Sequence, residues 1–186
     1  MKTVILWSSA NTDGLTAAAK DTFLAGLHEQ GIETEDIFLN GLTIRPCLAC
    51  GNGFGQCLSD GSCVQEDDFA TVYKKLVEAD GIVLVTAVYF HDLTEQFKLF
   101  IDRLRRCEAL RDGDLKGKTC TLVACAGGSG NGAVECLNIM ETTVRHMKMT
   151  PTDRISITRY NRDYMLPALR SSGARYAQFL TEGGND

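Results

Sequence analysis

The chain has 186 residues, of which 44% are hydrophobic and 23% are charged, and this composition is typical of a compact soluble domain. Its 24 acidic and 19 basic side chains give a net charge of −5, which excludes a basic surface that follows nucleic-acid phosphates. The apolar runs are far shorter than the roughly 20 residues of a transmembrane helix, so we expect no membrane span. The amino terminus turns polar at Ser8 and lacks a signal-peptide pattern, which favours a cytoplasmic protein.

Apolar runs of strand length alternate with helix-periodic segments along the chain, which is typical of α/β folds. In chain order, the sequence predicts a strand at residues 3–8, a helix at 15–30, a strand at 32–39, a helix at 67–79, a strand at 81–87, a helix at 94–107, a strand at 118–125, a helix at 133–149, a strand at 151–158 and a helix at 166–180. Right-handed crossovers between five such strands predict a doubly wound parallel sheet with helices on both faces. We expect a single domain over residues 1–186 with a Cys-rich insert at about 45–66.

Ligands of doubly wound sheets bind at the carboxyl ends of the strands, which directs attention to the loops at residues 8–16, 87–93 and 126–132. The first loop contains Ser9, Asn11 and Thr16 and leads from a strand into a helix. Hydroxyl groups and free amides at a helix N-terminus can bind a phosphate monoester without Lys or Arg, and this loop has neither. The loop lacks the Walker and Rossmann glycine patterns. The alternative is that these side chains only cap the helix.

The second loop follows the third predicted strand and carries two adjacent aromatic residues, Tyr89 and Phe90. A planar ring could be held there by backbone amides and flanked by either aromatic side chain. The alternative is that both rings belong to the core.

The third loop, residues 126–132, is dense in glycine. Residues 128–133 fit the pattern GxGxxA, but they follow the fourth strand and no acidic residue ends the next strand, so a dinucleotide site is disfavoured. Glycines at this position would let the backbone approach the edge of a flat ligand. A merely flexible connection is the alternative.

Several short motifs occur in a characteristic order along residues 3–132. They are the Ser-rich first loop ending in Thr16, Cys47-Leu48-Ala49-Cys50, Cys63-Val64, Asp67-Asp68-Phe69, Glu78-Ala79-Asp80-Gly81-Ile82-Val83, Val88-Tyr89-Phe90, Lys98, Phe100-Ile101-Asp102-Arg103 and Gly127-Gly128. This pattern resembles the flavodoxin-like NAD(P)H-dependent FMN reductases, and the branch it resembles most includes the iron–sulfur flavoproteins.

The resemblance implies a flavodoxin-like sheet in the order 2-1-3-4-5, FMN as cofactor, NAD(P)H as a transient co-substrate, and a homodimer or homotetramer. By the same resemblance, the FMN phosphate would be held by Ser9, Asn11, Leu15 and Thr16. The isoalloxazine and ribityl chain would be bordered by Thr86, Ala87, Val88, Tyr89 and Phe90, and the pyrimidine edge by Gly127 and Gly128. The sequence departs from the family at Ala10 and Ala87, where proline is frequent or usual, and both changes loosen a turn without removing a donor.

Four of the eight cysteines, Cys47, Cys50, Cys57 and Cys63, fall within one short stretch. Their thiolates could bind a [4Fe–4S] cluster or a tetrahedral zinc ion, or they could remain free thiols. The compact iron–sulfur branch usually has two residues between its second and third cysteines, whereas this chain has six, three of them glycines. The other four cysteines are scattered and are expected to pack as small apolar side chains.

The sequence contains no pattern of a paired acid and base or of a nucleophilic triad, so no catalytic side chain is assigned, and the chemistry would belong to the flavin. We expect an FMN-dependent oxidoreductase that passes electrons from NAD(P)H to a quinone, a flavin or another small acceptor. The alternatives are an iron–sulfur flavoprotein that carries electrons between partner proteins, and a scaffold without flavin. The basic residues Lys74, Lys75, Arg103, Arg105 and Arg106 are expected to form a solvated helix face.

Overall fold

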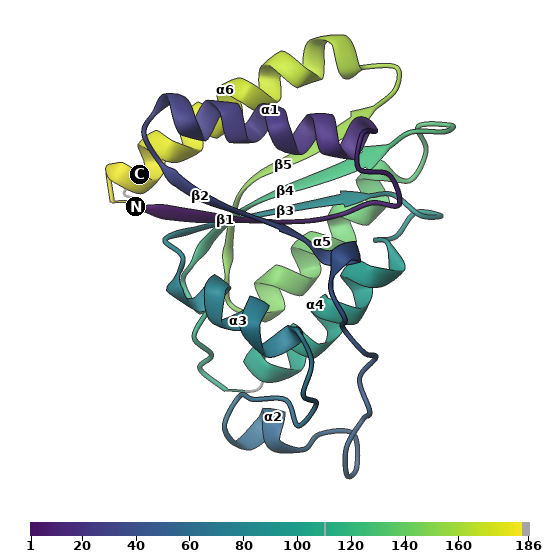
Figure 1. Ribbon diagram of the computed structural model, residues 1–186, viewed down its shortest axis with the longest axis vertical. Helices are drawn as coiled ribbons and strands as arrows, with labels where there is room; N and C mark the ends of the chain where they lie inside the picture. The colour runs from purple at the N-terminus through teal and green to yellow at the C-terminus, as the bar shows by residue number, and fades with distance from the viewer. Residues whose placement is uncertain (110, 184–186) are drawn as a thin grey trace.

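The computed structural model describes residues 1–109 and 111–183. Within these residues, five strands form one parallel sheet in the order β2-β1-β3-β4-β5 (Figure 1). The strands are β1 (Lys2–Ser8), β2 (Glu33–Phe38), β3 (Gly81–Ala87), β4 (Thr119–Ala126) and β5 (Thr150–Thr158). The predicted flavodoxin-like fold class and strand order are therefore confirmed.

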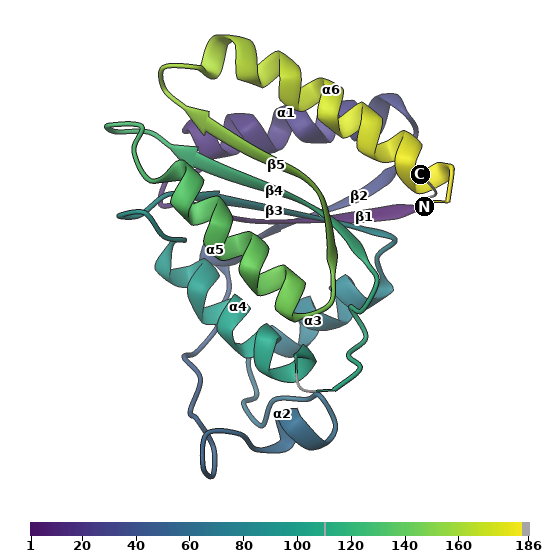
Figure 2. The same cartoon turned by 180° about the vertical axis from the view of Figure 1, so that it is seen from behind.

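Helices cover both faces of the sheet (Figures 1 and 2). One face carries α1 (Leu15–Glu29) and α6 (Arg162–Thr181), and the other carries α3 (Phe69–Glu78), α4 (Glu95–Glu108) and α5 (Ala133–His146). Side chains of β1 alternate between the two layers, with Val4 and Leu6 in one apolar cluster and Ile5 and Trp7 in the other. Because both faces are covered, the strand is apolar throughout, as expected for a central parallel strand.

Two helix boundaries differ from the prediction by three residues or more. Helix α6 begins at Arg162, one turn before the predicted residue 166, and contains Pro167 in its interior. Pro167 is the sixth residue of the helix, so it lacks the amide that would donate to Asp163 O, and the helix loses that one hydrogen bond. Helix α5 ends at His146 rather than at residue 149, because Lys148 adopts a φ of 60° and turns the chain into β5.

The strand register brings the three candidate loops to one edge of the sheet. Ser8 of β1 pairs with Thr86 of β3, and Thr86 pairs with Ala124 of β4, so the three strands end nearly level with one another. Their loops project on the right-hand side of Figure 1, and the two chain termini lie on the opposite side. None of the described helices is long and apolar enough to cross a membrane.

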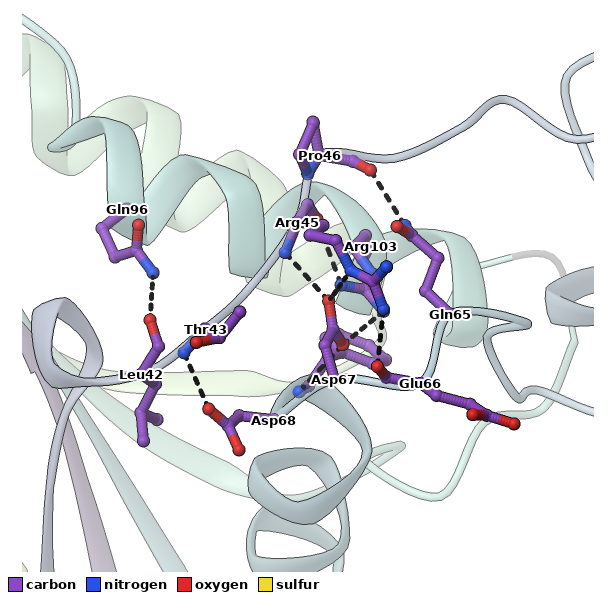
Figure 3. Close-up of polar contacts among 11 residues, drawn as sticks. Leu42, Thr43, Arg45, Pro46, Gln65, Glu66, Asp67, Asp68, Gln96 and Arg103 are labelled. Atoms are coloured by element: carbon purple, nitrogen blue, oxygen red, sulfur yellow. Dashed lines mark hydrogen bonds and ion pairs between the residues drawn. The ribbon is translucent and has the colours of Figure 1, made fainter.

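The Cys-rich insert lies elsewhere in the molecule. It follows the short helix η1 (Leu39–Gly41), contains the short helix α2 (Gln56–Ser59), and projects beyond α3 and α4, away from the sheet (Figures 1 and 2). Its two ends are joined by hydrogen bonds (Figure 3): Arg45 N to Asp67 Oδ2 at 2.9 Å and Gln65 Nε2 to Pro46 O at 2.9 Å. These bonds close the base of the insert into a defined loop.

Candidate functional site

The first loop buries two hydroxyl side chains at the start of α1. Ser9 is 7% exposed and Thr16 is 3% exposed, whereas Asn11 is exposed and Leu15 is half-buried. Gly14 occupies the N-cap position and has no side chain with which to cap the helix. The first amides of α1 therefore remain directed toward the loop, where a phosphate group could accept from them.

Two residues outside the first loop hold it in place. Asn40 Oδ1 accepts from Ser8 Oγ at 2.7 Å and from Ser9 N at 3.2 Å, and Ser8 Oγ also shares a short hydrogen bond with Thr94 Oγ1. Thr94 Oγ1 accepts from Phe97 N at 3.3 Å, so Thr94 also caps α4. The role of Asn40 could not be found in the sequence, because it depends on the contact between η1 and the end of β1.

The second loop forms a tight two-residue turn that holds Phe90 in solvent. Tyr89 and Asp92 exchange two backbone hydrogen bonds of 2.9 and 3.1 Å, and between them Phe90 and His91 adopt φ values of 45° and 70°. Non-glycine residues with such φ values are strained, by about 1 kcal/mol or more each. Phe90 is 97% exposed and Tyr89 is 37% exposed, so the alternative that both rings belong to the core is wrong.

The second and third loops line a common open groove of about 400 Å³. Val88, Phe90, Gly127 and Gly128 are among its lining residues, so the structure brings these four predicted site residues together. The loops contact each other where His91 lies over Gly132: a Cβ atom at Gly132 would stand only 2.8 Å from His91 Cα. Thr86 and Ala87 lie at the end of β3 and are not among the lining residues of this groove.

The four cysteines of the insert meet at a second location. Cys47, Cys50, Cys57 and Cys63 are half-buried and line one pocket, which we call the cysteine pocket, together with buried Cys107 of α4. The cavity between them is about 20 Å³. Within the described residues, no three His, Cys, Asp or Glu side chains converge closely enough to hold a single metal ion. In a [4Fe–4S] cubane, by contrast, each cysteine binds a separate corner iron. The four cysteine sulfurs therefore surround the whole cluster and do not converge on one ion.

Helix α4 forms the wall of the cysteine pocket. The helix lines the pocket with Arg103, Arg106 and Cys107. These residues share one face of the helix because they are three and four positions apart. Arg106 Nη1 donates to Gly53 O of the insert. Arg103 is only 1% exposed, so its expected place on a solvated helix face is wrong; it pairs with Asp67 at 2.6 Å. This burial could not be found in the sequence, because only the insert packed against α4 removes Arg103 from water.

Comparison with known proteins identifies the family. The profile of the family described as NADPH-dependent FMN reductase matches residues 1–161. The chain belongs to this family. It is an FMN-binding, flavodoxin-like oxidoreductase family, and the groove and the first loop lie at the edge of the sheet where flavodoxin-like folds bind FMN.

Curated relatives of this family member are archaeal. An iron-sulfur flavoprotein of Methanocaldococcus jannaschii is 37% identical over 73% of this chain and 66% of its own length. An iron-sulfur flavoprotein of Methanosarcina thermophila is 36% identical over 58% of this chain and 53% of its own length. The matched region thus spans about two thirds or less of the length of these relatives.

The solved structures show the same fold at low sequence identity. An NAD(P)H:quinone oxidoreductase from Methanothermobacter marburgensis superposes with a TM-score of 0.75 at 17% identity, covering 95% of this chain and 96% of the other. At this identity the likeness concerns the fold alone.

Proposed function

We propose that this protein is an FMN-dependent oxidoreductase that takes hydride from NAD(P)H and passes electrons to a quinone, a flavin or another small acceptor. The observation that carries the proposal is the meeting of three loops at one sheet edge, with an exposed aromatic ring beside an open groove. Bound FMN would supply the redox chemistry, and the residues of the chain would bind and orient the reactants.

The first loop would hold the FMN phosphate. Ser9 and Thr16 place two buried hydroxyl groups beside the uncapped amides of α1, and exposed Asn11 and half-buried Leu15 border the same loop. The partial positive charge at the helix N-terminus favours a phosphate dianion, although the loop has no basic side chain. Asn40 and Thr94 would act indirectly, by fixing Ser8 and Ser9.

The second and third loops would hold the flavin ring. Gly127 and Gly128 have open space where a Cβ would project, so a flat ligand could approach their backbone closely. Val88 and Phe90 line the same groove. Because Phe90 is held outward by a strained turn, its ring is available to border the isoalloxazine or a nicotinamide stacked on it.

The phosphate assignment is tested by combining Ser9→Ala with Thr16→Val. We expect FMN binding to weaken by about 2–4 kcal/mol, because two hydrogen bonds to a charged group are lost. Fluorescence titration of the metal-free protein with FMN measures the dissociation constant. Thr22→Val is the matched control, because Thr22 lies on α1 and its hydroxyl donates to Ala18 O. An unchanged dissociation constant in the double variant would remove the assignment.

The use of NAD(P)H is tested separately. Anaerobic addition of NADPH or NADH to the FMN-loaded protein is expected to bleach the flavin absorbance. A flavin that only dithionite reduces would contradict the proposed hydride donor and leave the FMN site standing.

The cysteine pocket supports a second candidate function, an iron–sulfur flavoprotein that carries electrons with a [4Fe–4S] cluster. Four half-buried thiols surround one pocket, and the curated relatives are named iron-sulfur flavoproteins. Anaerobic reconstitution with iron and sulfide is expected to give about four irons and four sulfides per chain, the content of one cubane. Zinc binding, or no binding at all, would contradict this assignment.

Two exposed apolar patches support a homodimer or homotetramer. Apart from Met1, the exposed large apolar side chains of the described residues form two groups. One group lies at the carboxyl edge of the sheet (Tyr89, Phe90, Val134, Tyr160 and Tyr164) and the other on the insert (Leu48, Phe54, Leu58 and Val64). Such concentration is typical of protein interfaces. Light scattering of the holoprotein measures the assembly, and a monomeric mass would contradict it.

A further inference from the structure

Arg103 is the largest fully buried side chain in the described part of the chain. A buried guanidinium is strongly destabilising unless its charge is balanced and its donors are used. Its charge is balanced by Asp67, whose side chain is also only 1% exposed. The burial is therefore compatible with a stable fold.

The two terminal nitrogens of Arg103 have acceptors (Figure 3). Nη1 donates to Asp67 Oδ2 at 2.6 Å and to Arg45 O at 3.1 Å, and Nη2 donates to Asp67 Oδ1 at 3.0 Å. The plane of the guanidinium lies against the Phe69 ring, with Cζ 4.3 Å from the ring centroid. These contacts fix the orientation of the side chain on three sides.

The third nitrogen, Nε, is buried and has no hydrogen-bond acceptor among the described residues. A buried, charged donor that has no acceptor destabilises the fold. Arg103 lines the cysteine pocket, so a group bound in that pocket could supply the acceptor that Nε lacks.

We propose that Arg103 Nε donates a hydrogen bond to a sulfur atom of the iron–sulfur cluster held in the cysteine pocket, and that Arg103 is a positioning residue that retains the cluster and raises its reduction potential. This inference rests on the second candidate function above. Four thiolates give the cluster a net negative charge that becomes larger on one-electron reduction, so a buried N–H donor stabilises the reduced form more than the oxidised form.

Asp67 links this donor to the shape of the insert. The same carboxylate that orients Arg103 also accepts from Arg45 N at 2.9 Å, at the chain entry of the insert. Arg103 is thus fixed to the base of the loop that carries the cysteines. Supporting groups of this kind typically change metal affinity about 10–100-fold when they are removed.

The first test compares Arg103→Lys with Arg105→Lys in the reconstituted full chain. Arg103→Lys keeps the positive charge but removes the Nε–H, whereas Arg105→Lys changes an arginine of the same helix that does not line the pocket. We expect Arg103→Lys to lower the midpoint potential of the cluster and to release iron to a chelator about tenfold faster or more. We expect Arg105→Lys to keep the wild-type potential. FMN affinity, measured at the remote sheet edge, reports that each variant is folded.

A second measurement needs no substitution and therefore does not depend on the folding of a variant. Pulsed EPR of the dithionite-reduced cluster in the wild-type protein labelled with ¹⁵N-arginine should show hyperfine coupling to one arginine nitrogen. Two results would overturn the role of Arg103 and leave the cluster assignment standing. One is a loaded wild-type cluster without such coupling, and the other is an Arg103→Lys variant with unchanged potential and iron-release rate. Failure of the wild-type chain to take up iron and sulfide would instead overturn the cluster assignment itself.

Discussion

At the scale of single residues, the eight cysteines divide into two sets with different surroundings. The four cysteines of the insert are half-buried, whereas the other four are buried in the core. Burial raises the pKa to about 12 for each member of the second set: Cys107, Cys120, Cys125 and Cys136. Their expected role as small apolar side chains agrees with this burial, although Cys107 also reaches the cysteine pocket.

This division predicts how the metal-free protein reacts with iodoacetamide. The nucleophile is the thiolate, so thiols with a raised pKa and no access to solvent react slowly. We expect rapid alkylation of Cys47, Cys50, Cys57 and Cys63 near pH 8, and alkylation of the remaining four only after denaturation. Peptide mass spectrometry measures the sites. Rapid labelling of Cys125, the residue beside the first loop, would show that the described packing is wrong.

At the scale of elements, α1 and α6 approach each other through two glycines. A Cβ atom on Gly26 would lie 2.1 Å from Arg170 O, and one on Gly173 would lie 2.3 Å from Phe23 O. Because both obstructing atoms belong to the backbone, no side-chain rotation can relieve the contact. This close packing holds α1, and with it the first loop, against the sheet.

Gly173→Ala is therefore expected to destabilise the protein, although alanine is normally the better helix former. We expect the free energy of unfolding to fall by about 1–3 kcal/mol through overpacking. Urea denaturation followed by circular dichroism measures this change. Ser171→Ala, an exposed position on the same helix, is the control and should change stability by about 0.5 kcal/mol or less. A Gly173→Ala variant as stable as this control would refute the close contact.

At the scale of the whole molecule, the Asp67–Arg103 pair connects α4 with the base of the insert and gives stability a dependence on pH. Burial raises the pKa of Asp67, but Arg103 and the amides of Arg45 and Phe69 outweigh burial and hold the pKa below its ordinary value. A group with a lowered folded-state pKa contributes stability above its unfolded-state pKa of about 3.9. That contribution is lost as the pH falls through the folded-state pKa.

We expect the free energy of unfolding of the wild type to decline as the pH falls below about 4. Asp67→Asn should be less stable at neutral pH by about 3–5 kcal/mol, because Arg103 then stays buried without a counter-charge, and its acid dependence should be flatter. Denaturant titrations from pH 3 to pH 7 measure both effects. Asp112→Asn, which removes an exposed partner of two lysines, should keep a slope close to that of the wild type. Equal slopes for all three proteins would contradict the assignment.

The sequence by itself determined the order of strands and helices and the three loops at the strand ends, because hydrophobic periodicity and strand–loop–helix order are local properties. The loops that carry Val88, Phe90, Gly127 and Gly128 were predicted from such local patterns. The family resemblance singled out these four residues, and the structure places them around one groove. Residues that act through distant contacts were missed. Asn40 reaches Ser8 and Ser9 only because η1 packs beside β1.

Only the tertiary structure decided the surroundings of the cysteines and of Arg103. The sequence shows an arginine among charged neighbours on a helix, which is typical of a solvated face. Its burial arises because the insert folds back on α4 and Asp67 closes the base of the insert on Arg103. Burial depends on what packs against a helix face from elsewhere in the chain, and helical periodicity carries no information about a partner that lies some 40 residues away in an irregular segment.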